Sequence, residues 1–170
     1  MTNKNIVNNS LEFVRSILEE SQHVDVYELC NIFGIEIIDS YSMDKEGYLV
    51  CSDGMKLIFI DAKVTNRHRK RFSVAHELGH YIMQQSQLFC CSNIEDKMLI
   101  ETNSSFQEKQ ANEFASELIL PKHKVEEELS DRITFDKVSR IASKFDVSIT
   151  MTAIKCIMCS KTEEETLLCY

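Results

Sequence analysis

The order of apolar and polar residues along the chain predicts a mainly helical protein with a small sheet. In the helical stretches, apolar residues recur every three or four positions, the spacing that places them on one face of a helix. In the strand stretches, short apolar runs are bounded by turn residues. The predicted helices cover residues 8–20, 25–33, 66–83, 106–120, 135–145 and 149–159. This pattern indicates the α+β class.

The predicted sheet lies between the second and third of these helices. The isoleucine-rich segment IEIIDSY, residues 35–41, predicts one strand. Two further apolar runs within residues 47–61 flank a Ser-Asp-Gly turn, which is typical of a hairpin. We therefore expect an antiparallel sheet of about three strands directly before the helix at 66–83.

No feature of the sequence marks a domain boundary. Residues 84–103 are polar and show no clear period, so an irregular segment is expected there. Pro121, the only proline, should end the helix at 106–120, because the residue before a proline is pushed out of helical geometry. With 170 residues and no low-complexity linker, the chain predicts a single domain over residues 1–170.

The net charge of the chain indicates which classes of binding partner to expect. The formal net charge of −8 argues against a broad nucleic-acid surface, which is usually basic, so no direct nucleic-acid contact is expected. One basic run, RHRKR at 67–71, is either a phosphate-binding patch or the solvated beginning of a helix. Residues 135–159 superficially resemble a helix-turn-helix, which keeps DNA binding open as an alternative.

The apolar runs and the cysteines indicate a reducing compartment away from membranes. No run approaches the ~20 apolar residues that a membrane span needs, and the first 20 residues lack the apolar core of a signal peptide. These features predict a cytoplasmic protein, where the seven cysteines are expected to stay reduced. The CxxC of Cys156 and Cys159 lacks the second pair that a structural zinc site needs.

Candidate chemistry is concentrated in the segment HELGH, residues 76–80. His76 and His80 lie about one helical turn apart, so both imidazoles can bind one ion. Glu77 is rotated away from them and can act as a general base on a water at that ion. The alternative is a histidine pair without a metal. Gly79 costs ~1 kcal/mol within a helix relative to alanine, which indicates that another backbone or a ligand approaches closely.

Two ligands do not complete a catalytic zinc site, which usually has three protein ligands and keeps one position for water. The candidate third ligand is Glu108, which borders the buried face of the helix at 106–120. A half-buried carboxylate is costly without a cation, although a helix N-terminus also favours negative charge. Asn112, one turn further on, either hydrogen-bonds a ligand imidazole or is a neutral polar residue. Gln110 is expected to face water.

Two segments together resemble the ImmA/IrrE family of zincin-like metallopeptidases: RFSVAHELGHYIM at 71–83 and EKQANEFASELILP at 108–121. The preceding MKLIFID and the charged run before the first segment are also similar to that family. The resemblance extends over about residues 25–125 and is followed by C-terminal helices within about 126–160. It implies a zincin-like fold. One departure is Gln110, because many members have glutamate there.

The resemblance also implies a site and a function. His76, His80 and Glu108 would bind one Zn²⁺ per chain, and Glu77 would be the catalytic glutamate of an endopeptidase. The implied substrate is a helix-turn-helix repressor encoded on a bacterial mobile element or prophage. The alternative is a non-catalytic antirepressor that binds the repressor and has a structural zinc site. A zinc hydrolase of small molecules is a third reading.

Two expectations concern how substrate is held. The strand at 56–60 directly precedes the histidine helix and is expected to offer an edge to which substrate backbone adds. The alternative is an ordinary internal strand. Tyr81 and His123 are candidates for stabilising the oxyanion by residue type only.

Overall fold

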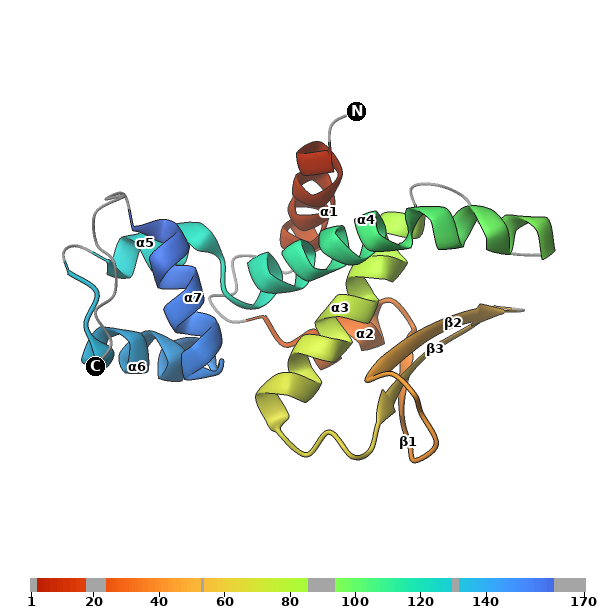
Figure 1. Cartoon of the computed structure of the whole chain (residues 1–170), viewed down its shortest axis with the longest axis horizontal. Helices are drawn as coiled ribbons and strands as arrows, with labels where there is room; N and C mark the ends of the chain where they lie inside the picture. The colour runs from red at the N-terminus through yellow and green to blue at the C-terminus, as the bar shows by residue number, and fades with distance from the viewer. Residues whose placement is uncertain (1–2, 18–23, 53, 86–93, 130–131, 161–170) are drawn as a thin grey trace. The chain divides into compact units, whose positions relative to one another are not determined.

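A computed structural model of the chain describes residues 3–17, 24–52, 54–85, 94–129 and 132–160. These residues hold seven helices and three strands (Figure 1), which confirms the predicted mainly helical α+β class. They form two compact units, the first ending at Ile119 and the second beginning at Leu120. Each unit is described by itself, and the single domain over residues 1–170 stays a prediction.

The first unit holds a sheet and four helices: α1 (Asn3–Ile17), α2 (Val26–Ile32), α3 (Arg67–Gln85) and α4 (Ile94–Ile119). α3 is central, because it contacts strands on one side and α4 on the other (Figure 1). α1 begins earlier than the predicted helix at 8–20, whose last residues lie outside the described part of the chain. α2 and α3 lie where helices were predicted.

The sheet consists of β1 (Glu36–Ser40), β2 (Gly47–Ser52) and β3 (Met55–Asp61) in the order β1-β3-β2. β2 and β3 form the predicted antiparallel hairpin. β1 pairs with β3 in parallel, so the expectation of a wholly antiparallel sheet is wrong. The physical reason is the connection at 41–46, which leads the chain past β3 to the far side of the sheet before the hairpin begins.

This strand order changes which edge is free. β3 is hydrogen-bonded on both sides, so the prediction that residues 56–60 offer an edge to substrate is wrong, and the internal-strand alternative is confirmed. In the part of the chain that the structure describes, the outer edge of β2 pairs with no further strand. An unpaired edge presents backbone N–H and C=O groups that another chain can bind.

The basic run at 67–71 is largely used inside the first unit. Arg69 forms an ion pair with Glu46, and Nζ of Lys70 lies 2.6 Å from Oδ1 of Asp39. Arg71 is buried and donates a hydrogen bond to the carbonyl of Val24. These contacts attach the sheet and its connections to the first turns of α3, so the run is neither simply solvated nor an open phosphate-binding patch.

α4 differs most from the prediction. It begins at Ile94, whereas an irregular segment was expected over 84–103, and α3 continues to Gln85. Residues 86–93 lie outside the described part of the chain. The sequence from Ile94 to Ile119 contains no glycine or proline, so nothing in it interrupts a helix even where apolar periodicity is absent.

The second unit holds α5 (Lys122–Glu128), α6 (Phe135–Phe145) and α7 (Ile149–Cys159). Pro121 ends the preceding helix as predicted and then begins α5, which was not predicted. The bounds of α6 and α7 are those expected from the sequence. Cys156 and Cys159 are both buried in α7, and neither forms a disulfide with a described residue. No helix among the described residues is long and apolar enough to cross a membrane.

Candidate metal centre

The core side of α3 sets the direction of its histidines. The predicted apolar face is confirmed, and His76 and His80 lie beside it with side chains that are 15% and 12% exposed. Packing of that face therefore fixes the helix so that both imidazoles lie at the boundary between core and solvent. The buried members of the face are Val74, Ala75, Leu78, Tyr81 and Ile82.

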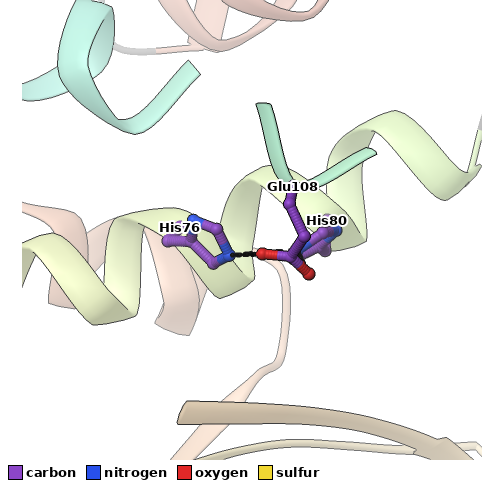
Figure 2. Close-up of side chains that lie close together, drawn as sticks. All are labelled: His76, His80 and Glu108. Carbon is purple, nitrogen blue, oxygen red and sulfur yellow. Dashed lines mark hydrogen bonds and ion pairs between the residues drawn. The ribbon is translucent and has the colours of Figure 1, made fainter. Parts of the chain in front are cut away.

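The two histidines of α3 and Glu108 of α4 converge on one point (Figure 2). Nε2 of His76 lies 3.0 Å from Oε2 of Glu108, and Nε2 of His80 lies 3.3 Å from Oε1. The two Nε2 atoms are 3.1 Å apart. The structure thus brings Glu108 of α4 to the two histidines of α3, although Glu108 lies far from them in the sequence.

These spacings fit a tetrahedral zinc site. Ligand atoms about 2.0–2.1 Å from zinc lie about 3.3 Å from one another in tetrahedral geometry. The separation of the two Nε2 atoms, and the distance from each Nε2 to the Glu108 oxygen that it contacts (Oε2 for His76, Oε1 for His80), lie within a few tenths of an ångström of that value. Two imidazole nitrogens and one carboxylate oxygen are also ligands that zinc accepts. His76, His80 and Glu108 are the group of potential metal ligands found among the described residues.

Asn112 orients one of the ligands. Its Oδ1 lies 3.0 Å from Nδ1 of His76 and accepts the proton there, which leaves Nε2 unprotonated and directed at Glu108. Burial lowers the pKa of His80, and the neighbouring His76 lowers it further. Both effects favour neutral imidazole, which is the form that binds a metal.

Glu77 lies next to this cluster but in a different environment. Burial raises its pKa to about 7, and the charge of Glu108 adds to the effect, whereas the backbone N–H of Leu49 and the charge of Lys45 oppose it. β2 also approaches closely, because a Cβ on Gly47 would lie 2.9 Å from Oε1 of Glu77. Glycine at this position therefore leaves room for the carboxylate between α3 and β2.

Gly79 allows α3 and α4 to approach. A Cβ there would lie 2.8 Å from Cδ1 of Phe114, a fully buried side chain of α4. The sequence predicted a close approach of backbone or ligand at this glycine, and the group that approaches is an aromatic ring. The contact sets the helix separation at which Glu108 reaches the histidines.

The position of Gln110 contradicts its prediction. It is 8% exposed rather than facing water. α4 contacts α1 as well as α3, so its buried arc is wider than a single stripe. The predicted buried face of α4 is otherwise confirmed. Nε2 of Gln110 has no hydrogen-bond partner within the described residues.

A cavity of about 600 Å³ opens over the cluster. Sequence reasoning missed the wall supplied by β2 and the connection before it, because only the strand register reveals their proximity to α3. Tyr81, a predicted oxyanion candidate, points into the core and does not line the cavity, while His123 belongs to the other unit. The lining residues are Lys45, Glu46, Gly47, Tyr48, Leu49, Phe72, Ser73, His76, Glu77, His80, Gln107, Glu108 and Asn112.

Comparison with known proteins agrees with the geometry. The profile of the Peptidase_M78 family, described as the IrrE N-terminal-like domain, matches residues 30–156. The chain is also 30% identical over 147 residues to "Metallopeptidase ImmA" of Bacillus subtilis (strain 168), covering 84% of this chain and 80% of the relative. The resemblance to the ImmA/IrrE family is thus confirmed, and the chain belongs to the Peptidase_M78 family of metallopeptidases.

Proposed function

We propose that this protein is a zinc-dependent endopeptidase that cleaves a helix-turn-helix transcriptional repressor in the bacterial cytoplasm. The observation that carries the proposal is the convergence of His76, His80 and Glu108 beside the buried Glu77, at the base of an open cavity. Family membership supports the peptidase activity.

His76, His80 and Glu108 would hold the ion. When bound, zinc supplies a Lewis acid for the peptide carbonyl and for the attacking water. Three protein ligands leave the fourth position for that chemistry, as in other catalytic zinc sites. Asn112 keeps Nε2 of His76 available by accepting the proton of Nδ1.

Glu77 would act as general base and then as general acid. Its carboxylate, whose pKa burial raises to about 7 when no metal is bound, would take a proton from the attacking water and return it to the leaving amine. The backbone N–H of Leu49 holds the side chain in position. β2 lies against one side of Glu77 at Gly47, and the side chain also lines the cavity.

Substrate backbone would add to the free edge of β2. This strand lines the cavity through Gly47, Tyr48 and Leu49, and an added strand gains backbone hydrogen bonds without requiring particular side chains. The edge therefore replaces the one originally expected on β3.

The repressor substrate is proposed from the family resemblance and from the relative whose name is Metallopeptidase ImmA. A repressor cleaved between its DNA-binding and oligomerisation parts would release its operator, so proteolysis would act as a switch. Location of the gene on a prophage or other mobile element belongs to the same proposal.

The test combines the purified zinc-loaded protein with the repressor encoded beside its gene. Wild type should cleave the repressor, and Glu77→Gln should retain zinc but lose about 10²–10⁴-fold in rate. Glu113→Gln, an exposed change on α4, is the matched control and should cleave normally. If Glu77→Gln still relieves repression as well as wild type, the protein is a non-catalytic antirepressor and the proposal is wrong.

A further inference from the structure

The connection from β1 to β2 is held against α3. Glu46 forms an ion pair with Arg69, and the hydroxyl of Ser73 lies 3.4 Å from its other carboxylate oxygen. Asp44 of the same connection accepts a hydrogen bond from the hydroxyl of Tyr48 in β2. These contacts give the end of the connection a defined position beside the cavity, so its side chains can contribute to recognition.

Lys45 belongs to this connection and lines the cavity. Its side chain is exposed, and Glu77 and His80 line the same cavity. Its Nζ is 5.8 Å from the centre of the ring of Tyr48, which lines the same cavity.

Lys45 differs from the nearby Arg69 and Lys70 of α3 in having no acidic partner among the described residues. Arg69 and Lys70 are each paired with a carboxylate. Lys45 has no ion pair with any residue that the structure describes. The neighbouring Glu46 is already engaged by Arg69, so the cavity wall carries one unneutralised positive charge beside Glu77.

The direction of β2 indicates which residues of a bound peptide would lie near Lys45. A peptide that adds antiparallel to β2 runs from the Ser52 end toward the Gly47 end. Lys45 comes two positions before Gly47, so the peptide residues nearest to it follow the cleaved bond. A carboxylate there would neutralise Lys45 without displacing a partner.

We propose that Lys45 is a specificity-determining residue that binds an aspartate or glutamate side chain on the C-terminal side of the cleaved bond. The inference rests on the proposed peptidase function and deepens it, because it names the kind of sequence that the enzyme prefers.

The probe is a peptide library made by tryptic digestion of a bacterial proteome. Zinc-loaded wild type, Lys45→Met and Lys45→Glu are each incubated with it, and new termini are identified by mass spectrometry. Lys63→Met is the matched control, because Lys63 is exposed and does not line the cavity. Matched synthetic peptides with Glu or Gln at the preferred position then give kcat/KM at low and high salt.

Wild type and Lys63→Met should favour an acidic residue after the cleaved bond by about fivefold, as expected for a solvent-accessible ion pair. Lys45→Met should lose the preference, with kcat/KM for the Glu peptide falling to the value for the Gln peptide, and Lys45→Glu should favour Lys or Arg. High salt should weaken the wild-type preference.

Three results would overturn the inference. Equal cleavage of the Glu and Gln peptides by wild type shows that no acidic side chain is recognised. A preference that persists in Lys45→Glu assigns it to another residue. A kcat that falls equally for both peptides in Lys45→Met shows that Lys45 acts on the reaction itself. If zinc-loaded wild type cleaves no peptide and no repressor, the proposed function fails and the inference fails with it.

Discussion

The α3–α4 pair and the α6–α7 pair place their polar side chains differently. α3 and α4 direct His76, His80 and Glu108 toward one another at an accessible cavity. In α7 the buried hydroxyl of Thr152 is satisfied within its own helix, because it donates to the carbonyl of Ser148, 3.0 Å away. A helix pair that directs two imidazoles and a carboxylate at one point of a cavity is suited to binding an ion. A hydroxyl that is hydrogen-bonded within its own helix contributes only to the stability of the fold.

Removing one large core side chain from each pair gives the largest expected effect. Phe114→Ala should lower the free energy of unfolding by about 3–5 kcal/mol, and Ile141→Ala by about 2–5 kcal/mol, because both side chains are fully buried. Only Phe114→Ala should also weaken zinc binding, since Phe114 sets the approach of α4 to Gly79. Urea denaturation and zinc titration measure the two quantities. Equal loss of zinc affinity in both variants would remove the distinction between the pairs.

Asn112→Ala should affect binding more than folding. Loss of the contact to Nδ1 of His76 leaves the imidazole free to rotate and to change tautomer, so zinc affinity should fall about 10–100-fold. Competition with a chelator gives the affinity, and Glu113→Ala is the exposed control on the same helix. An unchanged affinity would show that Asn112 does not support the site.

The caps of the α6–α7 pair should affect folding and leave zinc binding unchanged. The hydroxyl of Thr134 accepts from the N–H of Lys137 at 3.3 Å, and that of Ser148 accepts from Met151 at 3.1 Å. Replacing either by alanine should cost about 1 kcal/mol of stability. Denaturant titration of each variant checks this, and a zinc affinity that falls in parallel would contradict it.

The smallest expected effect is the pH dependence of the Glu46–Arg69 pair. The hydrogen bond from Arg69 lowers the pKa of Glu46 from its ordinary 4.5. A lowered carboxylate pKa stabilises the folded state above pH 4.5, and this contribution disappears as the pH falls through the lowered pKa. Because both side chains are well exposed, the contribution should stay below about 1 kcal/mol.

At pH 7, Glu46→Gln should therefore have a slightly lower melting temperature than wild type. At a pH below the lowered pKa of Glu46, the two proteins should have the same melting temperature. Thermal unfolding of both proteins, measured from pH 7 down to a pH below the pKa of Glu46, tests the prediction. A difference that grows toward low pH would have the wrong sign.

Local signals explain why much of the molecule was predictable. α6 and α7 have apolar periodicity and a short polar connection, and Asp146 ends α6 in the left-handed conformation, so their bounds match the sequence prediction. The histidine spacing of α3 depends on helical geometry alone. Glu108 was predicted as the third ligand because it borders the apolar face of its helix, and the structure brings it to the histidines.

The remaining features depend on contacts between distant segments. The parallel pairing of β1 with β3 follows from the path of the connection at 41–46, which no local pattern encodes. Burial of Gln110 depends on α1 as a second neighbour of α4. The cavity wall around Gly47 follows from the register of β2 on β3, so Lys45 could not be connected with the site from the sequence.

Metal content tests the central claim most directly. Wild type, Glu108→Ala and the control Glu113→Ala are purified, equilibrated with zinc, dialysed and measured by inductively coupled plasma mass spectrometry. Wild type and Glu113→Ala should retain one zinc per chain, and Glu108→Ala should retain much less while keeping its circular dichroism spectrum. A wild type that retains no zinc, or a Glu108→Ala variant that retains as much as wild type, would contradict a metal centre built by His76, His80 and Glu108.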